Sequence, residues 1–421
     1  MLDIKVIREQ TEIVRNGIKA KNAEDNIDAI LALDNQRRML IGEGEALKAK
    51  RNEVSARVGR MKKSGEDASP VIEEMNSVKT RIQQIDEELK NVEEKLEELL
   101  LTVPNIPHSS VPIGRTPDNN QTVFEWGEKP KNDFELKPHW DITNTLGIID
   151  FDRGSKVAGA GFPFYVGKAA ILQRALINFF LDQAGEHGYT ELQAPIVVNK
   201  ESARGTGQIP DKEDMMYVAT RDELYMIPTA EVPVTNFHRK ETFEEKDLPI
   251  KYAGYTPCFR REAGSYGKDV RGLNRLHQFD KVELVKFVHP STSYDELESL
   301  RGDAERLLQL LNLPYRVLLM CTGDMGFTQT KKYDLEVWAA GQQKWLEVSS
   351  CSNFETFQAR RMNIKFKSRE TGKQEFVHTL NGSGLALPRI VAAIIENNQT
   401  PEGKVIVPKV LQQYTKFSVI E

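Results

Sequence analysis

The feature that most constrains this chain is a heptad pattern of apolar residues between positions 71 and 99. From Val71 to Leu99, apolar side chains recur at alternating intervals of four and three residues, which is the pattern of a coiled-coil seam. The positions between them carry mostly Glu, Lys, Gln and Asn. At about 1.5 Å per residue, such a helix extends roughly 45 Å, which exceeds the width of a compact domain. We therefore predict one long, exposed helix here.

A weaker seam precedes this helix. Its apolar residues stand every seven positions but are interrupted on the adjoining row by Arg37, Gly44 and Arg51. Between the two seams, residues 62–70 contain the Gly, Ser and Pro residues of a turn. Two long helices joined by a short loop must run antiparallel. We predict a protruding helical hairpin within an N-terminal domain of residues 1–104. The residues of the weaker seam are Leu33, Leu40, Leu47, Val54 and Met61.

The charge on the predicted hairpin is uneven. Although the whole chain has a net charge of −5, the stretch from Lys48 to Lys63 holds seven basic residues and only one acid, Glu53, a net charge of +6. Two interpretations stay open: a solvated helix face, or an arm that contacts phosphates. The stretch has no base-reading motif, so such an arm would bind the backbone and shape of RNA.

A proline-rich connector at residues 103–114 ends the heptads and separates the hairpin from a second domain, residues 105–421. There, helical patterns mix with short alternating segments, which indicates an α+β fold. Residues 168–186 are predicted to be a helix. Residues 189–198 are predicted to be a strand, and Pro195 within it indicates a sheet edge or a bulge.

Composition places the chain among globular proteins with free thiols. Hydrophobic residues make up 39% of the chain, and no apolar stretch reaches the roughly 18–20 residues of a membrane span. The first ten residues lack the apolar core of a signal peptide. The cysteines, Cys258, Cys321 and Cys351, are too few and too far apart for a disulfide framework or a Cys-rich zinc site. We expect a cytoplasmic protein.

Residues 255–285 combine charged and aromatic side chains in a predicted strand–loop–strand unit. Alternation in residues 255–262 places Arg260 and Glu262 on one face. A Gly-containing stretch follows, and the return strand, residues 277–285, carries Phe279, Lys281 and Glu283 on one face. The unit offers a guanidinium for phosphate, a carboxylate and an aromatic ring for a base. The alternative is a salt-bridged sheet surface.

Two later segments supply further polar groups. In residues 344–353, Glu347 and Ser350 have the hard oxygen atoms that Mg²⁺ prefers. In residues 380–389, a Gly-Ser-Gly turn is expected to approach a ligand closely and to lead into a helix. Arg389 would stand at the start of this helix, where it opposes the macrodipole, so a ligand is the expected reason for its position.

These segments resemble the three motifs of class II aminoacyl-tRNA synthetases. Helix 168–186 with the strand near Pro195 resembles motif 1, the dimer-forming element. Phe259-Arg260-x-Glu262 with the returning Phe279 resembles motif 2, and the Gly-Ser-Gly turn leading into Arg389 resembles motif 3. Strings at residues 229–231, 259–265, 347–353 and 378–384 resemble the seryl-tRNA synthetase family. The hairpin resembles its tRNA-binding arm, so the resemblance covers essentially the whole chain.

The resemblance implies an antiparallel catalytic sheet and a role for each motif residue. Arg260 and Arg389 would be catalytic, Glu347 and Ser350 would hold Mg²⁺, and no zinc is expected. The implied ATP-binding residues are Arg260, Arg261, Glu262, Arg271, Phe279, Glu347, Val348, Ser349, Ser350 and Arg389. The implied serine-binding residues are Thr229, Ala230, Glu231, Arg260, Glu283, Asn381 and Ser383.

The activity implied by the resemblance is the ATP-dependent charging of tRNA(Ser) with serine by a homodimer, with tRNA(Sec) as a further substrate. Two alternatives share the catalytic motifs. A ligase that charges a carrier protein would lack the long hairpin. An inactive synthetase-like RNA-binding protein would be expected to break one of the motif positions, and Arg260, Glu262, Glu347 and Arg389 are all intact.

Overall fold

The computed structural model describes residues 1–262 and 271–421. The described chain divides into two compact units, residues 1–19 with 23–104 and residues 20–22 with 105–421. None of the helices in the described ranges combines the length and the apolar character needed to cross a membrane.

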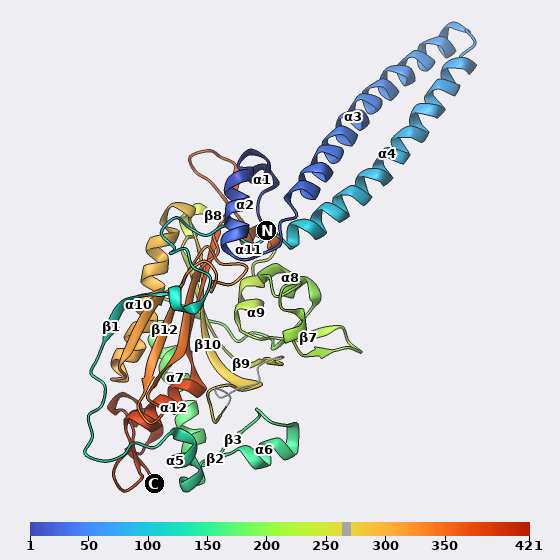
Figure 1. Ribbon diagram of the computed structural model, residues 1–421. Helices are drawn as coiled ribbons and strands as arrows, with labels where there is room; N and C mark the ends of the chain where they lie inside the picture. The colour runs from blue at the N-terminus through green and yellow to red at the C-terminus, as the bar shows by residue number, and fades with distance from the viewer. Residues whose placement is uncertain (263–270) are drawn as a thin grey trace. The chain divides into compact units, whose positions relative to one another are not determined.

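The first unit is built of four helices, and its two long helices form the predicted antiparallel hairpin (Figure 1). Helices α3 (Ile27–Ser64) and α4 (Ser69–Leu101) are preceded by α1 (Ile4–Glu9) and α2 (Thr11–Ala20). Helix α3 ends at Gly65, whose φ of 75° is the left-handed conformation that glycine adopts without strain. Helix α4 begins with Pro70 in its first turn.

The seam of the hairpin is apolar along its length. Near the tip, Val54 and Val58 of α3 pack against Val71 of α4. Nearer the base, Leu40 packs against Ile85 and Val92. These side chains are buried, and each contributes on the order of 1.5–3 kcal/mol relative to exposure. The heptads therefore predicted both helices and the faces by which they meet.

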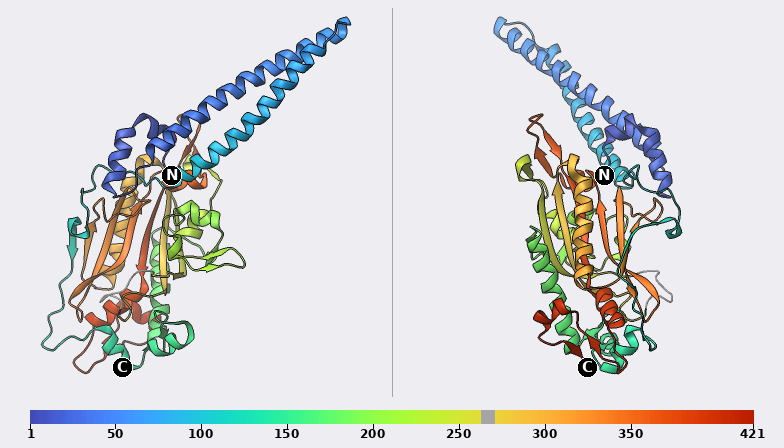
Figure 2. Two further views of the ribbon diagram at one scale, coloured as in Figure 1. Left: turned by 45° about the vertical axis from the view of Figure 1, so that its right-hand side comes forward. Right: turned by 90° about the vertical axis from the view of Figure 1, so that its left-hand side faces the viewer.

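The second unit is built around an eight-stranded sheet, seen in two orientations in Figure 2. All neighbouring strands are antiparallel except the edge pair β4–β9. This confirms the predicted α+β fold with an antiparallel sheet. In spatial order the strands are β1 (Gln121–Trp126), β11 (Tyr315–Leu319), β12 (Lys331–Ala339), β13 (Lys344–Asn353), β16 (His378–Ala386), β10 (Gln278–Val288), β9 (Ile250–Phe259) and β4 (Thr190–Glu191).

The three longest helices described in this unit share one buried core with this sheet: α7 (Lys168–Glu186), α10 (Ser293–Leu310) and α12 (Leu387–Asn397). Helix α7 has the bounds predicted from the sequence. The remaining α-helices are α5 (His139–Leu146), α6 (Phe151–Ala158), α8 (Lys200–Thr206), α9 (Glu231–Asn236), α11 (Phe357–Met362) and α13 (Gln412–Thr415).

The short strands form four small sheets beside the main one. They are β2 (Ile149–Asp150) with β3 (Phe164–Tyr165); β5 (Val197–Val198), β6 (Val218–Ala219) and β7 (Leu224–Met226); β8 (Thr242–Glu244), β14 (Lys365–Lys367) and β15 (Gln374–Phe376); and β17 (Val405–Ile406) with β18 (Val419–Ile420).

The strand predicted at residues 189–198 is wrong as a single element. The structure divides it into β4 at the edge of the main sheet and β5 in a separate sheet with β7. Residues 192–196 between them are not in a strand. Pro195 has no N–H to donate to a ladder, which is a physical reason for the break.

Candidate active site

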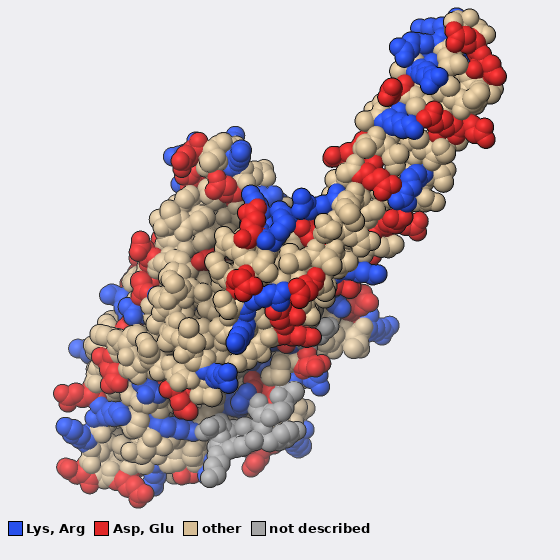
Figure 3. Space-filling model, turned by 45° about the horizontal axis from the view of Figure 1, so that its top comes forward, with Lys and Arg blue, Asp and Glu red and all other residues tan. Residues whose placement is uncertain are grey.

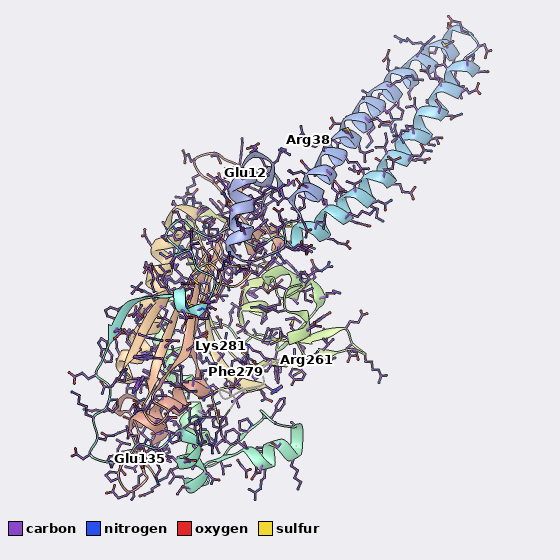
Figure 4. All side chains as sticks on the ribbon, viewed as in Figure 1. Glu12, Arg38, Glu135, Arg261, Phe279 and Lys281 are labelled. Atoms are coloured by element: carbon purple, nitrogen blue, oxygen red, sulfur yellow. The ribbon has the colours of Figure 1, made fainter. Side chains whose placement is uncertain are left out.

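A cavity of about 350 Å³ lies over the central strands of the main sheet and collects most of the predicted nucleotide-binding residues. Phe279 and Lys281 of β10, which line it, are labelled in Figure 4. Its lining residues are Arg260, Glu262, Leu273, Asn274, Arg275, Leu276, Phe279, Lys281, Glu347, Val348, Ser349, Ser350, Ser383, Ala386, Pro388 and Arg389.

Arg260 and Glu262 reach the cavity from irregular backbone, so the prediction that they continue the strand is wrong. Strand β9 ends at Phe259. Beyond it the Arg260 N–H donates to the His277 carbonyl at 2.8 Å. Glu262 has a φ of 50°, a left-handed conformation that cannot continue a strand.

Two of the predicted motif 2 residues, Arg260 and Phe279, contact each other at the cavity. The Arg260 guanidinium lies 5.1 Å from the centre of the Phe279 ring, and its Nε donates to the Pro228 carbonyl at 3.3 Å. The Glu262 carboxylate forms an ion pair with Arg275. Residues 263–265 of the predicted 259–265 string, and the rest of the Gly-containing stretch through 270, lie outside the described residues.

Glu347 and Ser350 share a face of β13 because the strand contains a bulge. Residues three apart in a regular strand point to opposite faces. Here Glu347 pairs with Glu336 and Ser350 pairs with Asp334, with a register shift between these pairs. The extra residue of a bulge re-aims side chains. The bulge therefore places both oxygen donors on the cavity.

Charged side chains, of which Asp334 is buried, surround these two donors. Protein packed around Glu347 favours its neutral form, but the charges of Lys332, Arg389 and Arg260 hold its pKa below the ordinary value. Burial raises the pKa of Asp334 to about 7, against the charge of Lys332, whose Nζ lies 3.0 Å from Asp334 Oδ2. Asp334 Oδ1 is buried with no hydrogen-bond partner in the described ranges.

The predicted Gly-Ser-Gly turn is wrong, because Gly382, Ser383 and Gly384 lie inside strand β16. A Cβ at position 382 would meet Cys351 Sγ at 3.0 Å and Leu300 Cγ at 3.1 Å. Gly382 therefore permits close packing within the protein and not the predicted close approach of a ligand. The predicted helix is confirmed: α12 has Pro388 in its first turn.

Arg389, in the first turn of α12, is held by two backbone carbonyls. Its Nη1 donates to the Glu347 carbonyl at 2.6 Å, and its Nε donates to the Asn274 carbonyl at 3.0 Å. Both bonds fix the guanidinium at the edge of the cavity. The residue thus connects segments that are far apart in the sequence.

The predicted serine-binding residues gather beside this cavity. Glu283 and Ser383 lie directly opposite each other on β10 and β16. Glu283 accepts a hydrogen bond from Thr229 Oγ1 at 3.0 Å and forms an ion pair with Lys281. Burial and the neighbouring Glu283 charge raise the pKa of Glu231 to about 7.

Four other predicted residues are buried and pack or bond within the protein. Ala230 belongs to a buried apolar cluster with Val285. Val348 belongs to the main core, and Ser349 Oγ donates to the Ser383 carbonyl at 2.7 Å. Asn381 is buried on β16 two residues before Ser383.

Arg261 and Arg271 do not line this cavity. Both line a larger neighbouring one of about 1220 Å³, to which Glu262 also contributes. Arg261 Nη1 donates to the Asp214 carbonyl at 3.2 Å. The Arg271 guanidinium lies 4.9 Å from the Trp140 ring centre. Because Glu262 lines both cavities, these two arginines adjoin the 350 Å³ cavity without lining it.

Sequence reasoning missed four polar residues that support the site. Half-buried Lys332 and buried Asp334 lie on β12, and nothing in their sequence marked them as part of the site. Gln358 Nε2 donates to Glu231 Oε1 at 2.6 Å. Asn274 accepts a hydrogen bond from Arg389 through its backbone carbonyl, so the identity of its side chain did not indicate this contact. Alternation along residues 331–339 was the one available indication that β12 places charged side chains next to β13.

Comparison with known protein families identifies both units. Residues 1–107 match the seryl-tRNA synthetase N-terminal domain, and residues 217–398 match the tRNA synthetase class II core domain (G, H, P, S and T). The serine–tRNA ligase of Salinibacter ruber is 55% identical over 424 aligned residues, which cover 100% of this chain and 99% of that relative.

Solved structures agree with these matches over the full length. Seryl-tRNA synthetase from Pyrococcus horikoshii, complexed with ATP, has a TM-score of 0.94 and 38% identity, covering 100% of this chain and 99% of that one. The cytoplasmic serine–tRNA ligase of Naegleria fowleri, in complex with AMP, has a TM-score of 0.89 and 30% identity with the same coverage. With its hairpin, antiparallel sheet and motif residues, this chain belongs to the seryl-tRNA synthetase family of class II ligases.

Proposed function

We propose that the 350 Å³ cavity activates serine with ATP and that the chain then transfers the seryl group to tRNA. The observation that carries this proposal is the convergence of Arg260, Glu262, Glu347 and Arg389 on one cavity. A ligase that charges a carrier protein would not need the hairpin. An inactive relative would not need this convergence.

In the first step, the serine carboxylate attacks the α-phosphorus of ATP, and pyrophosphate leaves with the electron pair of the broken P–O bond. Negative charge gathers on phosphate oxygens, so fixed positive charge accelerates the step more than a proton shuttle does. Arg260 would contact the serine carboxylate and the α-phosphate. Arg389 would cover the adenine, opposite Phe279.

In the second step, a terminal ribose hydroxyl of tRNA attacks the acyl carbon, and AMP leaves with the bonding electrons. The hydroxyl proton leaves to solvent or to the departing phosphate. Binding both partners in line supplies most of the acceleration.

The carboxylates of Glu231 and Glu283 suit the ammonium and hydroxyl of serine. Glu283 is already bonded to Thr229, so its orientation is fixed before serine binds. A site built to bond a hydroxyl rejects the analogue without it by up to about 10⁴–10⁵-fold. Alanine would leave these groups unpaired.

Magnesium fits the donors on β13. Among residues 1–262 and 271–421, no cluster of three or more His, Cys, Asp or Glu side chains is arranged for a metal ion. Mg²⁺ needs only one or two protein carboxylates when phosphates and water complete its shell. Glu347 and Ser350 would hold it, and the unpartnered Asp334 Oδ1 beside them supports an additional positive charge there. When bound, the ion neutralises phosphate charge.

Four further assignments are proposals from the family. The domain of residues 1–104 would bind tRNA through the hairpin, and tRNA(Sec) would be charged as well. Helix α7 would contribute to a homodimer, and the three buried, unpaired cysteines suit a reducing cytoplasm.

Pyrophosphate exchange with each of the twenty amino acids tests this function. Exchange should require ATP and Mg²⁺ and should be fastest with serine by at least about 10²-fold. Exchange that is faster with another amino acid would overturn the serine assignment. Charging of a carrier protein but not tRNA would establish the first alternative.

A further inference from the structure

Behind the nucleotide cavity, a fully buried carboxylate lies in a closed hydrogen-bond network. Glu396 of α12 has no exposed surface. Its Oε1 accepts from the His139 backbone N–H at 3.0 Å, from His139 Nδ1 at 2.7 Å and from Gln342 Nε2 at 2.7 Å. Its Oε2 accepts from the Gln342 backbone N–H at 3.0 Å. Four donors satisfy this carboxylate, which fixes its position.

His139 links the fixed Glu396 carboxylate to a backbone segment beside the cavity, residues 271–275. Its Nε2 accepts the backbone N–H of Leu273 at 2.8 Å. Because Nε2 is an acceptor, the ring proton resides on Nδ1, which donates to Glu396. The imidazole therefore bridges α12 and residues 271–275 with one donated and one accepted bond.

Three successive residues of that segment bind three different partners. Leu273 binds His139, the Asn274 carbonyl accepts from Arg389 Nε at 3.0 Å, and Arg275 forms an ion pair with Glu262. Two of these partners belong to the implied ATP-binding residues: Arg389, proposed to cover the adenine, and Glu262. The position of residues 273–275 therefore sets the positions of both.

The first residues of α5 pack tightly against the beginning of the same segment, residues 271 and 272. A Cβ at Gly272 would lie 2.3 Å from His139 Nε2 and 3.0 Å from Trp140 Cε3. Gly272 has a φ of 65°. Arg271 lies over Trp140 and 3.8 Å from Asp141. Backbone packed this tightly has little freedom to shift while the imidazole is present.

We propose that His139, fixed by Glu396, is a positioning residue for nucleotide binding, which acts through residues 273–275 on Arg389 and Glu262. It touches neither substrate. The inference rests on the nucleotide role proposed for Arg389. It assigns a function to a buried pair that lies outside the three family motifs and outside the cavity lining.

Two substitutions of His139 each retain one of the two hydrogen bonds made by its ring. His139→Gln retains an acceptor near the Nε2 position for the Leu273 N–H, whereas His139→Asn retains a donor near Nδ1 for Glu396. The inference predicts that His139→Asn raises the KM for ATP by about tenfold, the effect of one lost buried hydrogen bond. His139→Gln should restore most of it. The KM for serine should change less than about twofold in both variants.

A control and a second variant guard against a general loss of folding. His187 pairs with Asp303 at 2.5 Å but contacts no residue of the segment, so His187→Asn should leave the KM for ATP unchanged. Gln342→Met removes a bond to Glu396 and one to Asn274 at a half-buried site. It should raise the KM for ATP a few-fold, with thermal unfolding measured in parallel.

Arg389→Ala separates failure of this inference from failure of the proposed function. If Arg389→Ala raises the KM for ATP while His139→Asn and Gln342→Met do not, the positioning role is wrong. If Arg389→Ala itself has no effect on the KM for ATP, the nucleotide role of Arg389 is wrong. Equal increases in the KM for ATP and for serine would show that His139 is only structural.

Discussion

In the hairpin, charged side chains lie at the surface and pair across the two helices, whereas beside the catalytic cavity the Lys281–Glu283 pair is enclosed. Lys48 lies 3.2 Å from Asp86 and Lys50 lies 2.8 Å from Glu74, all four substantially exposed. Figure 3 shows Lys and Arg interspersed with Asp and Glu along the hairpin. Lys281 and Glu283 form their ion pair with less than a tenth of either side chain exposed.

The difference determines how much one residue matters. An exposed ion pair contributes about 0–1 kcal/mol. Removing one partner of a buried pair costs about 3–5 kcal/mol, because the other charge is left without compensation. The hairpin should therefore tolerate single changes and respond to their sum, while the cavity should fail at single positions.

The largest expected effect comes from removing the hairpin. Replacing residues 35–97 by a short Gly-Ser linker should leave serine-dependent pyrophosphate exchange within about twofold, because the cavity belongs to the other unit. Charging of tRNA should fall below detection. Full-rate charging by this variant would show that the hairpin is not the tRNA contact.

Glu283→Ala should reduce kcat/KM for serine by at least about 10²-fold, because it removes a proposed substrate contact and leaves Lys281 unpaired. The KM for ATP should change much less. Glu283→Gln, which can still accept from Thr229, is the matched control and should lose less activity. A parallel loss of ATP and serine binding would contradict the serine role.

The two regions also differ in how far their sequences predicted them. The hairpin follows from a period repeated over local sequence, so its helices, seam and direction were predictable. The heptad period alone was enough to predict that Val71 and Ile85 are buried. Its charge was less predictable, because the partners of Lys48 and Lys50 lie on the other helix and reduce the net charge presented by the basic stretch.

In the cavity, the motifs predicted which residues converge but not the backbone that places them. The bulge in β13 depends on pairing with β12. The left-handed turn at Glu262 depends on contacts beyond β9. The requirement for glycine at position 382 depends on the packing of α10 against β16. These are tertiary effects that one strand's alternation does not encode.

Serine activation should depend on pH through Glu231. Burial and Glu283 raise its pKa to about 7, while Lys281 and Lys212 oppose the rise and Gln358 bonds the carboxylate. Below this pH the group is neutral and attracts the serine ammonium less. If only the ionised form binds serine, kcat/KM should fall about tenfold between roughly pH 8 and pH 6.

Two variants test whether Glu231 is the group that causes this pH dependence. Glu231→Gln should flatten the profile at a low value. Asp334, whose pKa is also raised to about 7 by burial, lies beside the proposed magnesium donors, so Asp334→Asn should leave the serine profile in place. A flat profile in the unmodified protein would refute the titration of Glu231.

The basic stretch of the hairpin should act through the sum of its charges. Arg60, Lys62 and Lys63 make no ion pair with any residue for which the structure gives a position. Replacing all three by Ala should raise the KM for tRNA by about tenfold and reduce its salt dependence. The double change Lys48→Ala with Lys50→Ala is the control, and its effect should be smaller. Unchanged salt dependence in the triple variant would favour the solvated-face interpretation.

The smallest expected effect concerns the weaker seam. Gly44 is buried in α3, and a Cβ there would lie 3.5 Å from Ile85 Cγ2, an ordinary van der Waals distance. Gly44→Ala should therefore fill space without a clash and stabilise the helix by about 1 kcal/mol. Thermal unfolding followed by helical circular dichroism measures this change, and exchange kinetics should be unaltered. Changes at separate seam positions are expected to add, whereas the cavity residues are bonded to one another and respond together. If Gly44→Ala stabilised the hairpin and also altered serine activation, the two units would be energetically coupled.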